Sequence, residues 1–251
     1  MSNKALVSVI VPVYNAASCI ADTILSVKNQ SYDNIELLLC DDDSTDGSLE
    51  IMREYECDNV HVLPRGEYGK GAACARNRGI DNARGRYIAF LDADDKWLPD
   101  KLTEQISFME DKKAAFSFTG YAFADEKCIP TGAVVKVPER ISYKQALGNT
   151  TIFTSTVIFD MEKLAKDDIL MPQVKSEDTA TWWKVLKKVD FAYGLDKALT
   201  LYRRQAGTLS SNKIEAIRRI WNLYRQVEHL SFIKSCYYFV LWAARAVIRR
   251  V

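Results

Sequence analysis

The sequence predicts an α/β fold in which helices cover both faces of a mostly parallel sheet. Short apolar runs alternate with segments of helical periodicity through the first half of the chain. Strands separated by helices of about ten to fifteen residues are typical of such a doubly wound sheet. Two of the apolar runs lead directly into acidic clusters, at 40–46 and 90–95. With 251 residues, the chain is long enough to bury one large core.

The individual elements follow from hydrophobic periodicity, which is about two residues in strands and about 3.6 in helices. Strands are expected at 7–13, 35–40, 60–63, 87–91 and 115–123. Helices are expected at about 18–30, 48–55, 71–83, 99–112 and 178–188, with one or two more in 213–251. Pro99 fits the first turn of its helix, because proline lacks the N–H that this turn leaves unpaired. The pattern loosens between about 124 and 160, which indicates a more variable half that shapes a second ligand.

Composition excludes several classes of protein. The hydrophobic fraction of 48% and the charged fraction of 27% are those of a globular chain rather than a disordered one. A formal net charge of +1 gives no case for nucleic acid as the main partner. The six cysteines are scattered without a CxxC pair, so we expect reduced, buried thiols in a cytoplasmic protein rather than disulfides or a zinc site. The first residues contain no apolar export signal, which also favours the cytoplasm.

The two acidic clusters indicate a ligand site. Each follows a strand that we expect to be buried, where carboxylates are costly unless they meet cations or hydrogen-bond donors. Ligands of an open α/β sheet bind outside the carboxyl ends of its strands, so we expect both clusters to face one crevice. Carboxylates in that position suit a divalent metal and a nucleotide, which points to an enzyme.

Five strings, taken in their order and spacing, match the motifs of one enzyme family. They are Val9 to Asn15, Asp41-Asp42 with 44–47, Ala75 to Ile80, 92–95, and Glu177-Asp178 ahead of Trp182-Trp183. The chain resembles the family 2 glycosyltransferases of GT-A fold, and over nearly its whole length it resembles the small bacterial members that act in teichuronic acid, capsule and exopolysaccharide synthesis. The resemblance implies a GT-A domain at 1–212, with a nucleotide-binding half at about 1–118 and an acceptor-binding half at about 119–212. A tail of basic amphipathic helices would follow at 213–251.

The second acidic cluster is implied to hold a metal ion. By resemblance, Asp94 is a direct ligand of Mn²⁺ or Mg²⁺, and Asp92 lies beside it on the metal or on the ribose. Such a hard cation takes carboxylate oxygens and bridges the phosphates of a sugar nucleotide. The alternative is a loop acid that caps the helix near Pro99, a role that Asp95 can fill.

The nucleotide itself is implied to contact residues of three further motifs. Asp42 corresponds to the family's ligand of the base or ribose, and its carboxylate can accept from a uracil N3–H. Tyr14 can stack on a pyrimidine, while Pro12 fixes the backbone that aims it. Arg76 resembles the family arginine near the base and phosphates. Asp43 departs from the usual glycine, although Asp tolerates a left-handed backbone better than most residues. Turn formation alone is the alternative for the first cluster, and a plain surface position is the alternative for Tyr14.

The acceptor side is implied to carry the general base, Asp178. An inverting transferase needs one carboxylate that takes the proton of the attacking acceptor hydroxyl. Glu177 and Trp182 are candidate acceptor contacts, and Arg203 is a candidate contact of the diphosphate. The alternatives are helix capping for the two acids, the hydrophobic core for Trp182 and an internal ion pair for Arg203. Gln205 stands where family members often carry a histidine, and glutamine is a poorer metal ligand than imidazole.

The implied reaction is an inverting, metal-dependent transfer of a sugar from a nucleotide sugar, expected to be UDP-linked, to a saccharide acceptor. In the family the acceptor is commonly lipid-linked. A sugar nucleotidyltransferase is the alternative enzyme, but residues 12–16 lack the glycine-rich basic loop which that reaction needs after the first strand. A nucleotide-binding assembly module without turnover is the alternative outside the enzymes, and the presence of both the metal acids and Asp178 argues against it.

The net positive charge of the chain is concentrated in the tail at 213–251. It holds eight Lys and Arg against two acids, a local charge of +6. Its end, 232–251, mixes aromatic and aliphatic residues with basic ones, and it is too short and interrupted to span a bilayer, which takes about 20 apolar residues. We expect the tail to lie peripherally on the anionic inner face of the cell membrane, where a lipid-linked acceptor would be. The alternatives are packing on the catalytic domain or on a second subunit in a homodimer.

Overall fold

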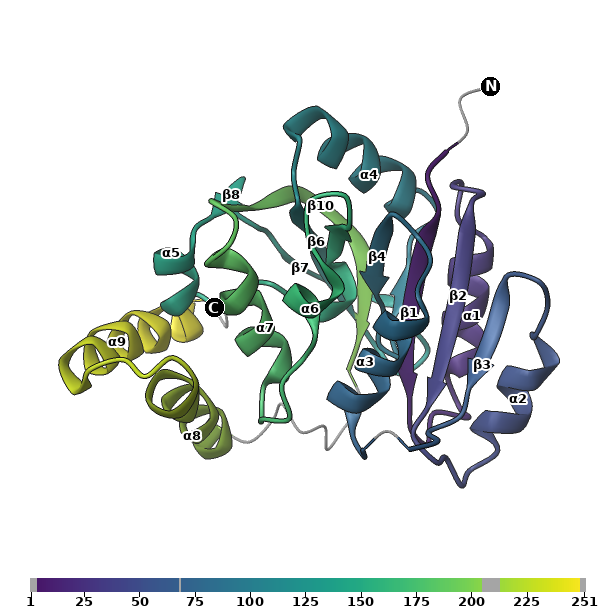
Figure 1. Cartoon of the computed structure of the whole chain (residues 1–251), viewed down its shortest axis with the longest axis horizontal. Helices are drawn as coiled ribbons and strands as arrows, with labels where there is room; N and C mark the ends of the chain where they lie inside the picture. Colours follow the sequence, from purple (N-terminus) through teal and green to yellow (C-terminus); the bar gives the residue numbers. More distant parts are fainter. Residues whose placement is uncertain (1–3, 68, 205–212, 249–251) are drawn as a thin grey trace.

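The chain is built around one mixed sheet, seen in a computed structural model that describes residues 4–67, 69–204 and 213–248 (Figure 1). The strands are β1 Val7–Val13, β2 Ile35–Asp41, β3 Val60–Leu63, β4 Tyr87–Phe90, β5 Lys96–Trp97, β6 Phe116–Ala124, β7 Pro130–Val135, β8 Arg140–Ile141, β9 Ile158–Asp160 and β10 Ala192–Arg203. The helices are α1 Ile20–Lys28, α2 Ser48–Glu54, α3 Ala72–Asn82, α4 Lys101–Lys112, α5 Tyr143–Leu147, α6 Lys166–Ile169, α7 Glu177–Leu186, α8 Lys213–Asn222 and α9 Phe232–Ile248, with helical turns η1 Thr154–Thr156 and η3 Leu223–Val227. The strand order is β3-β2-β1-β4-β9-β6-β10-β5, and β7 and β8 pair with β6 and β10.

Helices cover both faces of the sheet because the side chains of its central strands alternate between two apolar clusters. Val9 of β1 packs with Ile24 of α1 in one cluster. Ile10, the next residue, packs with Ile80 of α3 in the other cluster, which also holds Trp183 of α7. Successive strand residues point to opposite faces of the sheet. Because both the odd and the even positions are apolar, both faces need to be covered by helices. The predicted doubly wound α/β architecture is confirmed.

The first half of the sheet is parallel, as predicted. Strand β1 pairs in parallel with β2 and β4, and β2 pairs in parallel with β3. Helix α3 approaches β1 closely, since a Cβ added at Gly79 would lie 2.4 Å from Cγ2 of Ile10. This contact holds α3, and with it Arg76 one turn earlier, against the strand ends. Helix α4 begins at Lys101, so Pro99 precedes the helix instead of occupying its first turn.

The second half departs from the simple pattern. Strand β9 lies antiparallel between β4 and β6, and β10 pairs in parallel with β6 along most of its length. Neither β9 nor β10 was expected from the sequence. The alternation of β10 is interrupted by Gly194 and by the polar pair Asp196 and Lys197, and its pairing with β6 shifts register on both sides of Ala198. Such irregularities bend a strand and hide its period.

The C-terminal helices pack on the α/β part of the molecule through one face. Ile220, Leu223 and Tyr224 are buried in the same cluster as Trp183, whose ring stacks on Tyr224 with centroids 5.5 Å apart. Figure 1 shows α8 and α9, in yellow, beside α7 and α5. The alternative of packing on the catalytic domain is therefore confirmed for this face. Within the described ranges, none of the helices combines the length and apolarity that a bilayer-spanning segment needs.

Candidate active site

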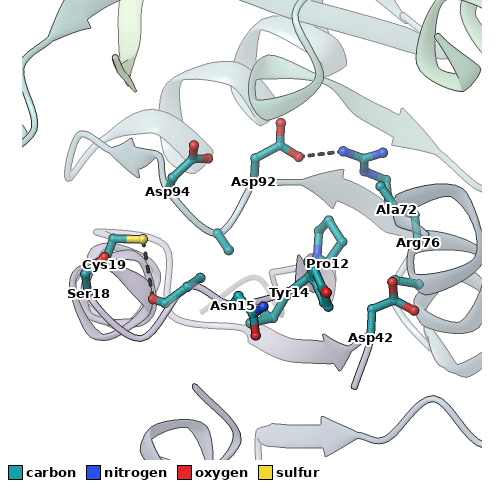
Figure 2. A pocket seen from close by; sticks show the side chains of 14 residues that line it. Pro12, Tyr14, Asn15, Ser18, Cys19, Asp42, Ala72, Arg76, Asp92 and Asp94 are labelled. Carbon is teal, nitrogen blue, oxygen red and sulfur yellow. Dashed lines mark hydrogen bonds and ion pairs between the residues drawn. The ribbon is translucent and has the colours of Figure 1, made fainter. Parts of the chain in front are cut away.

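One pocket of about 450 Å³ opens at the carboxyl ends of β1, β2 and β4 (Figure 2). Both acidic clusters reach it, which confirms the expected convergence on one crevice. The expected site residues that line it are Pro12, Tyr14, Asp42, Arg76, Asp92 and Asp94. Its other lining residues come from 13–19, from Ala72 and Ala75 of α3, and from Ala93.

The floor of the pocket is shaped by hydrogen bonds between the loops that follow β1 and β2. Asn15 has a left-handed backbone with φ of 49°, and its Oδ1 accepts from the N–H of Thr45 at 2.8 Å. The N–H of Ala16 donates to Oγ of Ser48 at 2.8 Å, and the N–H of Ala17 donates to a carboxylate oxygen of Asp46 at 2.9 Å. The expected turn chemistry of residues 44–47 therefore fastens the end of β1, where Pro12 and Tyr14 line the pocket.

Asp42 presents an oxygen that lacks a protein donor. Its Oδ2 accepts from the N–H of Gly71 at 2.9 Å, whereas the buried Oδ1 makes no hydrogen bond within the described residues. The nearest cation, Nε of Arg65, lies 3.9 Å from Oδ1, which is too long for a hydrogen bond. A buried acceptor without a donor is costly, so this oxygen is suited to a donor on a ligand. Asp43, next to it, adopts the left-handed backbone expected there, with φ of 58°, and pairs with Arg65.

Arg76 joins three parts of the site. Its Nη2 donates to Oδ1 of Asp92 at 2.6 Å, and its Nη1 donates to Oε1 of Glu177 at 2.8 Å. Burial of the guanidinium disfavours its charge, but the two carboxylates outweigh burial and raise the pKa of Arg76 above its ordinary value, with a smaller contribution from Asp178. Arg76 is thus fixed as a cation in the pocket wall, and it links α3 to the loop after β4 and to the start of α7.

The second acidic cluster concentrates negative charge. Burial and the charge of Asp92 raise the pKa of Asp94 to about 6. Burial, followed by the charges of Asp92 and Asp94, raises the pKa of Asp95 well above its ordinary value. Asp95 accepts from Oγ of Ser155 at 2.5 Å and from the N–H of Arg203 at 3.1 Å, so it is an internal acid of the loop and does not cap α4.

The chemistry of Asp92 and Asp94 fits a hard divalent cation. Burial and the charge of Asp92, two positions earlier, raise the pKa of Asp94, and a cation beside both carboxylates would stabilise their charged forms. In the part of the chain that the structure describes, no group of three or more His, Cys, Asp or Glu is placed to hold a metal. One or two protein carboxylates, completed by phosphate oxygens and water, is a usual coordination for Mg²⁺. Gln205 lies outside the described residues.

Arg203 is engaged inside the protein. Its Nε donates to the carbonyl of Asp94 at 2.8 Å, Nη1 to the carbonyl of Glu126 at 3.0 Å and Nη2 to Oδ2 of Asp22 at 3.2 Å. The side chain is only 4% exposed and is absent from the lining of the pocket. The expected contact with a diphosphate is therefore replaced by the alternative, an internal ion pair, and Arg203 positions the loop that carries Asp94.

Asp178 stands in the first turn of α7, beside Glu177. Its Oδ2 accepts from Oγ1 of Thr154 at 3.2 Å, and its Oδ1 accepts from the N–H of Thr179 at 2.6 Å. The second bond satisfies an N–H of the first turn of α7, and the acid at this end of the helix also compensates the helix dipole, which is part of the alternative for Asp178. The carboxylate is only partly buried, so it combines a fixed orientation with access from outside.

Trp182 was a candidate acceptor contact, and the structure corrects this. The side chain is 2% exposed, and its ring packs at centroid distances of 5.6 to 6.2 Å from Phe90, Phe116 and Phe159. It belongs to the core because residue 182 falls on the face of α7 that meets the sheet. Tyr14, in contrast, is 53% exposed, and Nζ of Lys70 lies 5.5 Å from its ring centroid.

Three residues near the site had no signal in the sequence. Ser155 donates to Asp95 and accepts from the N–H of Asp92 at 3.1 Å, which sets the loop after β4. Thr154 orients Asp178, and Arg65 faces Asp42 and Asp43. None of the three lies in a motif, so only their positions in the fold reveal them.

Comparison with known proteins places this geometry in context. Residues 8–159 match the family described as Glycosyl transferase family 2. The chain is 43% identical over 251 residues to TuaG of Bacillus subtilis (strain 168), named for teichuronic acid biosynthesis, covering 99% of this chain and 98% of that protein. It is 38% identical over 222 residues to WfaP of Escherichia coli, a UDP-Glc:alpha-D-GlcNAc-diphosphoundecaprenol beta-1,3-glucosyltransferase, covering 88% of this chain and 86% of that protein. A solved mannosyltransferase from Pyrobaculum calidifontis, PcManGT in complex with GDP-Man and Mn²⁺, superposes with a TM-score of 0.72 at 19% identity, covering 97% of this chain and 74% of that one.

Proposed function

The chain belongs to glycosyl transferase family 2, and we propose that it transfers a sugar with inversion from a UDP-sugar to a saccharide acceptor in the synthesis of a cell-surface polysaccharide. Membership confirms the resemblance, the GT-A fold and the enzyme class, so both alternatives, a nucleotidyltransferase and a module without turnover, are set aside. The observation that carries the proposal is the pocket in which Asp42 and the pair Asp92 and Asp94 line opposite ends (Figure 2).

The nucleotide occupies this pocket with its base toward Asp42. The unpaired Oδ1 of Asp42 would accept the N3–H of uracil, which supplies the donor that the protein lacks. Tyr14 offers an exposed ring at the same end, and Pro12 shapes the strand end beside it. A uridine-linked donor is favoured because WfaP, a full-length relative, is named for UDP-Glc.

The diphosphate lies toward Asp94. Asp94 and Asp92 would hold Mn²⁺ or Mg²⁺, which offsets the charge that develops on the departing diphosphate. Support comes from the raised pKa of Asp94, which burial and the neighbouring charge of Asp92 cause, and from the Mn²⁺ bound by PcManGT. Arg76 stabilises Asp92 from the opposite side, and Arg203 fixes the backbone of Asp94. The protein therefore holds both carboxylates in position before a ligand binds.

Asp178 takes the role of general base. The acceptor hydroxyl attacks the anomeric carbon, its proton passes to the carboxylate of Asp178, the bond from that carbon to the diphosphate oxygen breaks, and UDP leaves. Thr154 and the N–H of Thr179 hold the carboxylate in one orientation, which is what a positioned base requires. Glu177 accepts a hydrogen bond from Arg76, which connects the pocket to the turn of α7 that carries Asp178.

The acceptor is a lipid-linked saccharide at the inner face of the membrane. WfaP is named for a sugar-diphosphoundecaprenol acceptor. The C-terminal helices support a membrane position, because they present an apolar outer surface made of Ile214, Ile217, Phe232, Ile233, Tyr237 and Val240. These six are more than half of the large exposed hydrophobic residues described in the chain, and they lie in its most basic segment. Apolar side chains with Lys and Arg beside them suit an anionic interface.

A thermal-shift screen tests the donor assignment. UDP-sugars, GDP-sugars and UDP alone are added to the protein with Mn²⁺ and with a chelator, because a ligand that binds the folded state raises its melting temperature. The proposal expects the largest shift with a UDP-sugar and Mn²⁺. A shift with GDP-sugars alone would contradict the uridine assignment, and equal shifts with metal and chelator would contradict the metal.

A further inference from the structure

A second cavity, of about 220 Å³, lies between the start of α7 and the inner faces of α8 and α9. It shares no lining residue with the nucleotide pocket. Three hydroxyl side chains, a guanidinium and an indole surround it over an apolar floor. These polar residues are Thr150, Ser176, Thr179, Arg219 and Trp242. Hydroxyls, a guanidinium and an aromatic ring are the groups that bind phosphorylated sugars.

Arg219 is the cation that lines this cavity, and among the described residues one ion pair, with Glu215, holds its guanidinium. Its Nε lies 3.5 Å from Oε1 of Glu215 as an ion pair, yet this buried nitrogen makes no hydrogen bond within the described residues. Glu215 also accepts from Nζ of Lys175 at 2.5 Å, so its charge is shared between two cations. The planar guanidinium of Arg219, held only by this 3.5 Å ion pair among the described residues, is suited to a phosphate, to which it can donate two parallel hydrogen bonds.

The cavity lies next to the candidate base. Ser176 and Thr179 line it, and they flank Asp178 in sequence on the first turn of α7. The same turn serves the nucleotide pocket, since Glu177 binds Arg76. A molecule seated in the cavity is therefore held beside Asp178, from a different direction than the nucleotide.

We propose that this cavity binds the diphosphate of the acceptor, which deepens and rests on the proposed function. A lipid-linked saccharide needs its diphosphate close to the membrane and its sugar hydroxyl at the base. The inner faces of α8 and α9 line the cavity, and the outer faces of the same helices carry the exposed apolar surface. The volume matches a diphosphate or one sugar ring and is too small for a second nucleotide sugar. Arg219 is then the residue that selects acceptors with a diphosphate.

The test uses decyl diphosphate as the probe, with the enzyme saturated with UDP and Mn²⁺ so that the nucleotide pocket is filled. Titration calorimetry compares wild type with Arg219→Gln and Arg219→Lys. Arg218→Gln is the matched control, because Arg218 is the exposed neighbour and does not line the cavity. Arg219→Gln should weaken the probe about tenfold or more, the scale of lost charge-assisted hydrogen bonds. Arg219→Lys should weaken it less, and Arg218→Gln should leave it within about twofold.

Two results would overturn the inference. One is equal affinity of Arg219→Gln and wild type for decyl diphosphate, and the other is equal binding of decyl glucoside, which has the same chain without the diphosphate. UDP affinity, measured in the same samples, shows that each variant is folded. A failure of the proposed function would give a different result. The wild type would then transfer no sugar from any nucleotide sugar, even though it binds decyl diphosphate through Arg219.

Discussion

Arg76 donates a hydrogen bond of 2.8 Å from Nη1 to Oε1 of Glu177, across 101 residues of sequence. Glu177 precedes Asp178 on α7, and Arg76 lines the nucleotide pocket on α3. This ion pair therefore fixes the proposed base, Asp178, relative to the proposed donor pocket. The guanidinium is buried and also binds Asp92, so both acids depend on one cation.

The first prediction concerns the stability of this junction. Arg76→Met should lower the free energy of unfolding by about 3–5 kcal/mol, because it leaves two partly buried carboxylates without their cation. Urea denaturation measures the loss. Arg53→Met, at an exposed position on α2, is the matched control and should change stability by about 0.5 kcal/mol or less. Equal effects of the two substitutions would show that the junction carries no special stability.

The second prediction separates the two ends of the nucleotide pocket. Asp42→Ala should weaken UDP about tenfold both with Mn²⁺ and with a chelator, since in our proposal the unpaired Oδ1 of Asp42 accepts from the base. Asp94→Ala should remove only the gain in affinity that Mn²⁺ provides. Titration calorimetry measures both, with Asp100→Asn, an exposed acid at the start of α4, as the control. Loss of the same metal-dependent gain in both alanine variants would refute this division.

The third prediction concerns the outer surface of the tail. The double variant Ile233→Asp, Val240→Asp should abolish sedimentation with anionic liposomes at low salt, because both side chains are exposed on α9 and the aspartates repel the lipid. Ile129→Asp, at another exposed apolar position outside the tail, should sediment as wild type does. Truncation after residue 212 is a poorer test, since it would remove Tyr224 from the core. Sedimentation of the double variant at the wild-type level would favour a surface that packs on protein.

The fourth prediction concerns Lys101, which is fully buried and whose Nζ makes no hydrogen bond within the described residues. Burial lowers the pKa of Lys101 well below its ordinary value, although the ammonium gains some stabilisation 3.7 Å from the ring centroid of Trp97. Between the lowered pKa and about 10.4, the unfolded chain binds a proton that the folded chain lacks. Wild-type stability should therefore rise with pH through this window.

Lys101→Met should be more stable than wild type at neutral pH, because it removes the cost of a buried unpaired amine. Its advantage should shrink as pH rises, by up to about 1.4 kcal/mol per pH unit within the window. Urea denaturation at several pH values between about 7 and 10 measures the difference. An advantage that stays constant over this range would show that Lys101 is not held with a lowered pKa.

The first half of the chain could be predicted because its strands are regular and its acids follow them directly. Asp42 and Asp94 are local in sequence to β2 and β4, so strand periodicity alone brings them to one edge of the sheet. The role of Arg203 could not be predicted in this way. Its partner Asp94 is 109 residues away, and β10, which carries it, has no regular alternation. Trp182 shows the same limit, since a helix pattern does not say which apolar face meets the sheet.

The central claim is that Asp178 accepts the proton of the acceptor while the donor is held elsewhere. The most direct measurement is the rate of sugar transfer by Asp178→Asn, with an acceptor that supports turnover by the wild type. The affinity of the same variant for the UDP-sugar is measured in parallel with Mn²⁺ present. The account predicts wild-type donor affinity and a transfer rate lower by about 10²-fold or more. A transfer rate near that of wild type would remove Asp178 from the mechanism.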